Sequence, residues 1–508
     1  MRLEQGIFLR ESTGLVKEAG FWDAVSINIA NMSIGPALAS IGFTLAALPT
    51  VAGANLVYAS LIAALLALPQ VIIYSTLIRY VPRVGGDYVW LSRALGPRLA
   101  WLTNGLVLGF IVQDLAYYAL IAIAAVFQLK SILPVLGLSV KLDMRLSVTI
   151  ATAFFAVIVL VNVLGTRYGI KLMTALTAVS IIGLLIAAAT LYVVPKAQVI
   201  NAVSSLLPAG YTYSEVVSGY SGPYFSMNTM LMLLPYFAIY VYPWLNAGPA
   251  IAAEIRGRNA LRWNIPMAFM LTLALMTLGF EAMYYSLGFN FVTAALSNPD
   301  LNSIINFWTI AMVSSHNLVL SWFIGIASVT WYLALLAYGA IVPIRYWFAL
   351  AFDRVWPGFF AYLSPRLGTP VYAHLLDLAI TATLITLTGV YYGTFTALYG
   401  ATIGALVYFL AVGAATLIMG ARVSLSFRVG KSTRVILLIA GALQMAVMIY
   451  LTYQFIKYPN LWGGNWLAYG VVVGSILLGT TAFLVSRHVN KRRYGIDIAA
   501  TYTEIPPE

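Results

Sequence analysis

Long apolar stretches alternate with short polar segments along almost the whole chain. Each stretch has roughly 18 to 25 residues, which is the length that a helix needs to cross a bilayer. The stretches are too long and unbroken for barrel strands, and lipid offers the backbone no hydrogen-bond partner, so helices are expected. We predict an all-α membrane protein of about twelve transmembrane helices, near residues 24–48, 52–78, 99–126, 146–164, 170–194, 227–253, 265–289, 319–350, 371–389, 394–418, 434–456 and 464–486.

The composition supports a membrane protein. Of the 508 residues, 61% are hydrophobic and 9% are charged, whereas a soluble domain carries about 25% charged residues. No soluble fold could cover so much apolar surface, so we expect membrane lipid as the natural partner. The chain has no cysteine and three histidines that are far apart in sequence, which argues against a disulfide framework and against a metal centre. No cofactor is expected.

The basic residues predict the orientation. A net charge of +12 could indicate nucleic acid, but Lys and Arg lie between the apolar stretches, as topology signals do. With twelve spans, only Lys130, Lys141, Arg145, Lys196 and Lys457 of the 28 Lys and Arg residues fall on one side of the membrane. The other, strongly basic side is expected to be cytoplasmic. We therefore expect both termini in the cytoplasm. We also expect the protein in the plasma membrane, without a nucleic-acid partner.

Two spans are interrupted in the middle. One interruption by itself is most simply a proline kink. Two interruptions that lie five spans apart indicate two five-helix repeats of opposite topology, and such broken spans mark the midplane site of a transporter. The interruptions read NIANMSIGPALA in the first span and YVYPWLNAGPAIAAE in the sixth.

The repeats divide the chain into five parts. Residues 24–195 form the first repeat and residues 227–418 the second, followed by two C-terminal helices in 434–486. Residues 1–23 and 487–508 are the N-terminal segment and the C-terminal tail, both cytoplasmic. At the breaks, half-helix N-termini suit a substrate carboxylate, and freed carbonyls suit an ammonium group or a metal cation.

Three stretches, in order and at matching spans, resemble the amino acid–polyamine–organocation transporter superfamily. They are PRVGGDYVWLSRALGPRLAW after span two, AEIRGRNALRWNIPMA at the exit of span six, and RYWFALAFDRVWPGFFAYLSPRLGTPVYA from the end of span eight into span nine. The resemblance covers roughly residues 15–420. It implies a five-plus-five inverted repeat with broken helices 1 and 6, and a substrate that is an amino acid, a polyamine or a related amine.

The resemblance places the substrate site at the two breaks, with Tyr240 as an aromatic gate. Two departures from the family pattern matter. Pro36 follows a first break that is less rich in glycine than the family's, and it offers no N–H donor. Trp244 stands where the family has glycine, so it should shrink or reshape the pocket. The substrate-binding residues expected at the breaks are Asn31, Met32, Ser33, Ile34, Gly35, Tyr240, Tyr242, Trp244 and Asn246.

Asp114 lies in the middle of span three. A carboxylate at that depth is costly and by default functional, so we expect it to pair with a substrate amine or to carry a proton. The alternative is a structural partner for a neighbouring polar group. Glu254 and Arg345, near the cytoplasmic ends of spans six and eight, are expected in polar networks of an inner gate.

The sequence leaves two candidates for the coupling ion, sodium and a proton. Many relatives without sodium coupling carry a lysine on span five, and the position that corresponds to it here is Ser180. Sodium could bind there with hydroxyls of span eight, for which Ser328 and Thr330 are the candidates. These two side chains point about 200° apart on an ideal helix, so only one of them can serve. A proton on Asp114 is the alternative.

These features predict a secondary active transporter that works by alternating access. A facilitator, an exchanger or a channel for another small polar metabolite, and a sensor with a transporter fold, are the alternatives. The chain contains no HExxH, G-x-S-x-G or phosphate-loop motif, so an enzyme is not expected.

Overall fold

The computed structural model describes residues 7–391, 402–422 and 429–507. Within these ranges the chain is helical and has no strand, apart from one isolated parallel bridge between Ala19 and Ile255. The beginning of the expected tenth span, together with Arg2 and Arg428, lies outside the described residues.

The prediction of about twelve spans is confirmed. In the described part of the chain, eleven stretches of helix are long and apolar enough to cross a membrane. The sixth expected span is not among them, because its helix α10 has only 14 residues before the chain leaves helical geometry at the predicted break.

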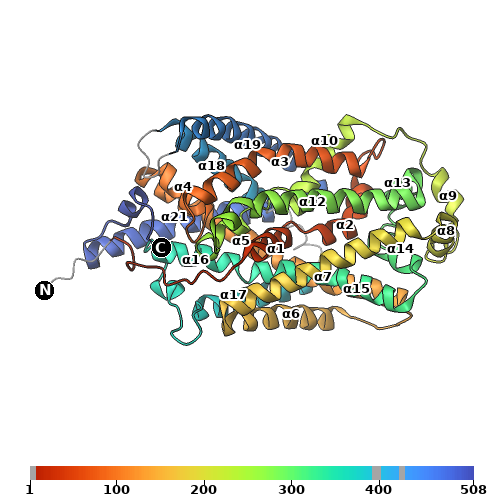
Figure 1. Ribbon diagram of the computed structural model, residues 1–508, viewed down its shortest axis with the longest axis horizontal. Coiled ribbons are helices and arrows are strands. Elements are labelled where there is room, and N and C mark those ends of the chain that lie inside the picture. Colours follow the sequence, from red (N-terminus) through yellow and green to blue (C-terminus); the bar gives the residue numbers. More distant parts are fainter. Residues whose placement is uncertain (1–6, 392–401, 423–428, 508) are drawn as a thin grey trace.

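Helices α1 to α9 form the first half of the chain (Figure 1). The first span is broken into α1 and α2, and the short helix α4 follows the second span. Their bounds are α1 Phe21–Asn31, α2 Ile34–Ala47, α3 Leu56–Tyr80, α4 Asp87–Leu95, α5 Ala100–Val135, α6 Met144–Leu164, α7 Thr166–Val193, α8 Lys196–Ser204 and α9 Tyr213–Ser218.

Helices α10 to α18 repeat this order with the opposite orientation in the bundle, and α19 to α21 follow them. Short helices α13 and α14 follow the seventh span, and they lie at the end of the bundle opposite to α4 (Figure 1). The bounds are α10 Met227–Tyr240, α11 Ala247–Ala250, α12 Arg258–Leu287, α13 Phe289–Ser297, α14 Phe307–Ser314, α15 Leu318–Gly339, α16 Val342–Phe352, α17 Val371–Val390, α18 Thr402–Ala421, α19 Lys431–Lys457, α20 Pro459–Trp462 and α21 Trp466–Tyr494.

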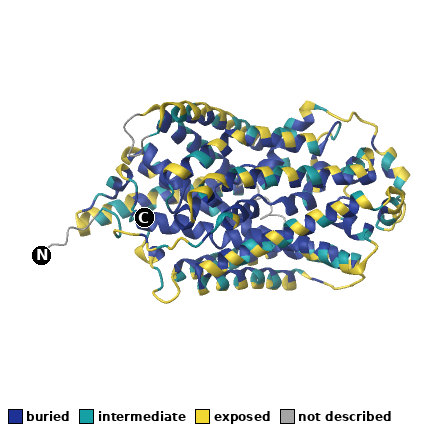
Figure 2. Cartoon of the chain, viewed as in Figure 1, coloured by how far each residue is buried: buried dark blue, intermediate teal, exposed yellow. Residues whose placement is uncertain are grey.

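The broken first span lies at the centre of the bundle. Helix α1 contacts α7, α12 and α15, and every residue from Asp23 to Asn31 is buried. Helix α5 is also almost entirely buried, whereas α19 and α21 at the periphery expose many apolar side chains. Figure 2 shows the buried residues gathered along the central helices and the exposed residues on the outer ones. The two breaks are therefore enclosed by protein, which is where a lipid environment tolerates non-helical backbone.

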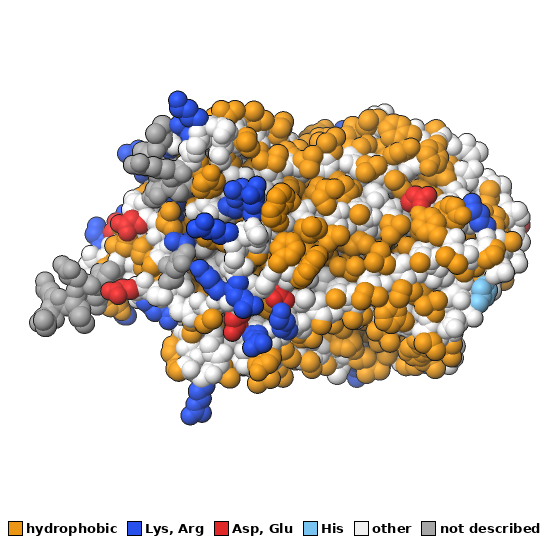
Figure 3. Space-filling view, viewed as in Figure 1, with side chains coloured by type: hydrophobic (Ala, Val, Ile, Leu, Met, Phe, Trp, Pro, Cys, Tyr) orange, Lys and Arg blue, Asp and Glu red, His pale blue; other side chains and the backbone are white. Residues whose placement is uncertain are grey.

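Charge separates the two ends of the bundle. Lys and Arg gather at the end where both termini lie, and apolar side chains cover the middle (Figure 3). We call this end, which includes α4, the basic end, and the end that includes α8, α9, α13 and α14 the far end. The C-terminal tail is ordered at the basic end. Helix α21 continues to Tyr494, and a 3₁₀ turn at Ile498–Thr503 packs against the bundle with Ile498 and Tyr502 buried.

Candidate functional site

The two predicted breaks meet in the structure. Helix α1 ends at Asn31 and α2 begins at Ile34, while residues 241–246 separate α10 from α11. The Nδ2 atom of Asn31 donates to the carbonyl oxygen of Trp244 at 3.1 Å and to Oδ1 of Asn246 at 3.0 Å. Asparagine can hold two segments in this way because its amide offers both donors and acceptors.

A second asparagine joins the same segments. Oδ1 of Asn28 accepts from the backbone N–H of Gly248 at 2.9 Å, and its Nδ2 donates to Oδ1 of Asn264 on α12 at 3.0 Å. A Cβ at Gly248 would lie 2.7 Å from atoms of Asn28 and Asn264, so only glycine allows this close approach. Two side-chain amides of α1 thus join the first broken span to the sixth, Asn31 at the break itself and Asn28 at α11.

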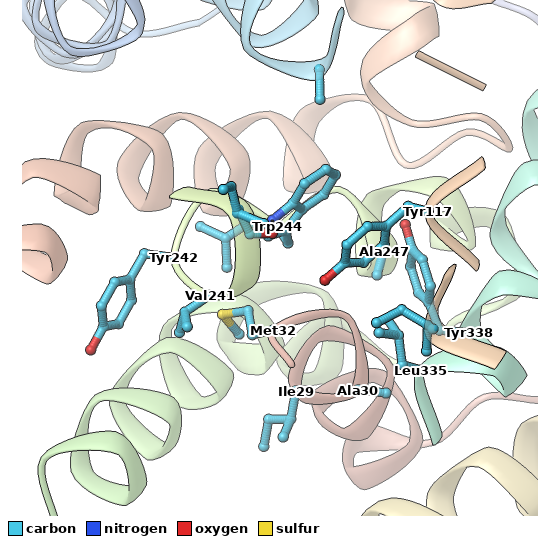
Figure 4. Close-up of a cluster of buried hydrophobic side chains, with 14 of the residues drawn as sticks. Ile29, Ala30, Met32, Tyr117, Val241, Tyr242, Trp244, Ala247, Leu335 and Tyr338 are labelled. Carbon is cyan, nitrogen blue, oxygen red and sulfur yellow. Dashed lines mark hydrogen bonds between the residues drawn. The ribbon is translucent and has the colours of Figure 1, made fainter. Parts of the chain in front are cut away.

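Trp244 fills the space between the breaks. Its side chain is 3% exposed, and its ring stacks on Tyr117 with 6.3 Å between centroids and on Phe110 with 6.5 Å. Figure 4 shows Trp244, Tyr117 and Met32 between the two broken spans. The indole Nε1 donates to the carbonyls of Ile239 at 2.8 Å and Ala238 at 3.1 Å. The indole therefore occupies carbonyls that the break of span six leaves without helical partners.

An open cavity lies between the breaks and the far end. Its volume is about 920 Å³, which is large enough for a ligand the size of an amino acid. Of the predicted substrate-binding residues, Tyr240 lines this cavity, whereas Asn31, Met32, Ser33, Trp244 and Asn246 are buried beneath it. The polar residues that line the cavity are Ser40, Thr44, Gln128, Lys130, Ser131, Tyr236, Tyr240, Ser303, Asn306, Tyr332 and Asn460.

Helical spacing could have indicated several of these cavity residues. Ser40 and Thr44 follow Pro36 at intervals of four and share one face of α2. Tyr236 lies four residues before Tyr240 on α10 and bonds to Ser40 at 3.1 Å and to the carbonyl of Ala37 at 2.6 Å. The hydroxyl of Tyr236 thus joins the halves of spans one and six that border the cavity.

Three predicted site residues have other contacts. A Cβ at Gly35 would lie 2.2 Å from Trp331, so Gly35 provides a close helix contact. Ile34 is fully buried in the core. Tyr242 points away from Trp244 (Figure 4), and its hydroxyl bonds to Ser60 on α3. The break residues therefore divide into some that face the gap and some that anchor it to neighbouring helices.

Asp114 is buried on α5 and does not line the cavity. The residue is 2% exposed, and its Oδ2 atom has no hydrogen-bond partner among the described residues. Tyr118 lies one helical turn further along α5, and its ring packs against Tyr338 with 5.8 Å between centroids. Tyr338 in turn accepts from Nδ2 of Asn246 at 3.3 Å. Asp114 is therefore close to the span-six break through two tyrosines, and a buried carboxylate oxygen without a partner there is costly.

The candidate hydroxyls for ion coupling separate into two sites. The Oγ of Ser180 lies 2.9 Å from Oγ1 of Thr330, so spans five and eight meet at these two oxygens. Ser328 faces span three instead and accepts from Nε2 of Gln128 at 2.9 Å. Both hydroxyls on span eight also bond to their own helix, at the carbonyls of Gly325 and Ala327. The pair Ser180 and Thr330 offers two oxygens of the kind that a hard cation takes, while Ser328 belongs to another contact.

The basic end is closed by buried polar groups. Arg345 forms a two-point ion pair with Glu254, at 2.8 and 2.9 Å, between α16 and the exit of span six. Arg93 on α4 forms another with Asp353, at 2.7 and 2.9 Å. The Arg93–Asp353 pair joins the two repeats, whereas Arg345 and Glu254 join spans six and eight within the second repeat. Two-point arginine contacts are geometrically specific.

Asp87 connects this closed end to the breaks. Its carboxylate accepts from the hydroxyls of Tyr74 at 2.7 Å, Tyr346 at 2.6 Å and Tyr408 at 3.0 Å. Tyr346 also accepts from Nδ2 of Asn246 at 3.3 Å. Burial raises the pKa of Asp87 to about 6, although the three tyrosine hydroxyls favour its ionised form. A continuous chain of hydrogen bonds thus runs from Asn31 to the connection between spans two and three.

The comparisons with known proteins agree with this architecture. No curated protein matches the chain. The sequence profile of the amino acid permease family matches residues 20–480, from the beginning of the first span into the last. The chain therefore belongs to the amino acid permeases of the amino acid–polyamine–organocation superfamily.

Proposed function

We propose that this permease is a secondary active transporter that moves an amino acid or a related amine across the plasma membrane by alternating access. The observation that carries the proposal is the direct contact between the two broken spans, Asn31 to Asn246, beneath a polar cavity. Broken helices in corresponding positions of two repeats are the arrangement in which transporters hold a substrate at the midplane.

The distribution of closed and open regions supports alternating access. The basic end is sealed by the pairs Arg345–Glu254 and Arg93–Asp353, while the cavity lies on the far side of the breaks. This is the arrangement expected of one half of a transport cycle. A channel would need a continuous path, and the stacked rings of Trp244 and Tyr117 stand between the cavity and the basic end.

Within the proposed substrate class, the cavity favours a zwitterion over a polyamine. Among the described residues that line it, none is Asp or Glu, and Lys130 is the only charged residue. A polyamine carries several positive charges and would find no carboxylate there to pair with. An amino acid presents one carboxylate and one amine, which suits hydroxyl and amide partners.

Uptake by purified protein in liposomes tests this proposal. Radiolabelled amino acids and the polyamine spermidine are supplied outside, with sodium and pH gradients imposed separately. Saturable accumulation of an amino acid under a gradient supports secondary transport. Flux that does not saturate indicates a channel, and exchange that requires substrate inside indicates an exchanger. Binding without any flux would overturn the proposal in favour of a sensor.

We also propose an orientation. Lys and Arg gather at the basic end (Figure 3), and the side of a membrane protein that is rich in these residues is the cytoplasmic one. Both termini would then lie in the cytoplasm. The chain has no cysteine, so a single introduced thiol reports its side without background. A thiol in Asn201→Cys, at the far end, should react with a membrane-impermeant maleimide on intact cells. A thiol in Ser432→Cys, at the basic end, should react only after lysis. The reverse result would overturn this orientation.

A further inference from the structure

The break in span six leaves a set of backbone carbonyls that need donors. Helix α10 ends at Tyr240, and the last carbonyls of a helix have no partners within it. The carbonyl of Phe237 is satisfied by the N–H groups of Val241 at 2.9 Å and Tyr242 at 3.0 Å. The carbonyls of Ala238 and Ile239 are not served by the backbone, since the chain turns away from the helix axis.

Side chains of the protein itself supply the missing donors. The indole Nε1 of Trp244 serves the carbonyls of Ala238 and Ile239 together. Further along the break, Asn31 donates to the carbonyl of Trp244 at 3.1 Å, and Nε2 of Gln70 donates to that of Pro243 at 2.7 Å. Four carbonyls of this segment therefore accept from neutral side-chain donors, and that of Pro243 also accepts from the backbone N–H of Leu245 at 2.9 Å.

Such carbonyls are suited to a cation. A helix C-terminus carries partial negative charge, and an ammonium group placed there gains both this electrostatic attraction and up to three hydrogen bonds. The neutral indole takes the hydrogen bonds without the charge. It is also held rigidly, because it is 3% exposed and its ring stacks between Tyr117 and Phe110. An incoming ammonium would have to displace the whole ring.

We propose that Trp244 is a built-in occupant of the amine-accepting carbonyls of span six, so that this permease does not require an amino group on its substrate. The inference rests on the proposed transport function and deepens it, because it extends the substrate class to compounds in which a hydroxyl replaces the amine, such as 2-hydroxy acids. Specificity for the amine is lost at this position because the protein satisfies the carbonyls in advance.

Matched ligand pairs test this inference by binding. The purified protein is titrated with the common L-amino acids and with the 2-hydroxy acids that carry the same side chains, and the shift in melting temperature gives each apparent Kd. For the best-bound side chain, the wild-type protein should bind the two members within about threefold of each other. Trp244→Ala removes the ring and exposes the carbonyls, so it should prefer the amino acid by about tenfold or more.

Two further variants separate the contributions of Trp244. Trp244→Phe keeps most of the ring but lacks the N–H donor, so it should lose stability without gaining preference for the amine. Trp466→Ala removes a tryptophan that is 83% exposed at the start of α21 and should behave as wild type. A wild-type preference of tenfold or more for amino acids, unchanged in Trp244→Ala, would overturn the inference.

The outcome is distinguishable from failure of the transport proposal. If Trp244→Ala changes the binding preference as predicted but no substrate is taken up into liposomes, the inference stands and the transport proposal is overturned. If the wild type takes up amino acids but strongly excludes every 2-hydroxy acid, the transport proposal stands and the inference is overturned. If no compound binds to the wild type or to Trp244→Ala, both are overturned.

Discussion

Nδ2 of Asn31 lies 3.0 Å from Oδ1 of Asn246, so a hydrogen bond between two side chains joins the breaks of the two repeats directly. Both residues are buried, and Asn246 also donates to the hydroxyls of Tyr338 and Tyr346. Any relative movement of the two breaks must change this contact.

Replacement of Asn246 should impair both transport and stability. Asn246→Ala leaves Asn31 and two tyrosine hydroxyls with fewer partners in a buried place, at a cost of about 1–3 kcal/mol. We expect uptake to fall at least tenfold and the melting temperature to decrease. Asn201→Ala, an exposed asparagine on α8, is the matched control and should match wild type in both. Normal uptake by Asn246→Ala would show that the contact is not needed for transport.

Asp114→Asn tests the buried carboxylate of span three. The substitution keeps the shape and removes the charge, and the lack of a partner for Oδ2 means that few hydrogen bonds are at risk. We expect transport, or its dependence on pH, to be lost while the protein still folds. Uptake is measured over a series of pH values, with size-exclusion profiles as the folding control. An unchanged pH series would assign Asp114 to structure.

The hydroxyl pair on spans five and eight tests sodium coupling. If sodium binds at Ser180 and Thr330, then Ser180→Ala and Thr330→Val should each reduce uptake driven by a sodium gradient by about tenfold. Ser328→Ala is the control, because its hydroxyl faces Gln128 and not Ser180. Accumulation driven by a pH gradient with no sodium present would end the sodium hypothesis and favour a proton carrier.

Asp87 should make stability depend on pH. The residue lies on α4, outside the membrane helices, and burial raises its pKa from 3.8 to about 6. A raised carboxyl pKa means that folding disfavours the ionised form. Stability should therefore fall as the pH rises from about 4 to about 6, by about 1.4 kcal/mol per pH unit, and then stay level.

Asp87→Asn should remove this dependence. The amide does not titrate, so the melting temperature of this variant should be flat between pH 4.5 and 7, where that of the wild type declines. Asp300→Asn, which replaces an exposed carboxyl at the far end, should keep the wild-type decline. Parallel curves for wild type and Asp87→Asn would contradict the assignment.

Docking of the C-terminal tail should depend on Tyr502. Its hydroxyl accepts from Asn104 at 2.6 Å and lies 3.2 Å from that of Tyr88, and the guanidinium of Arg93 lies 5.4 Å from its ring. Tyr502→Ala removes a buried aromatic side chain, so residues 495–507 should exchange backbone hydrogen for deuterium much faster. Thr503→Ala, one residue further and exposed, should leave the exchange slow. Slow exchange in both variants would mean that the tail is held by other contacts.

The sequence by itself determined the membrane class, the number of spans and the position of both breaks. These features depend on the length of apolar stretches and on proline and glycine, which act within a few residues of their own position. The same local signals placed Asn31 and Asn246 at the breaks. The spacing of Ser328 and Thr330 also indicated correctly that the two side chains face different partners.

Tertiary structure alone decided what surrounds the breaks. The indole of Trp244 reaches carbonyls only a few residues away, but its ring is held there by Tyr117 and Phe110 of α5, which are far away in sequence. The contact of Gly35 with Trp331 likewise joins distant helices. The cavity lies beyond the breaks for the same reason, because the bulk of Trp244 and Tyr117 fills the gap itself. Local patterns specify which residues leave the helix, but the partners of a freed carbonyl are set by whichever side chains the fold brings within about 3 Å.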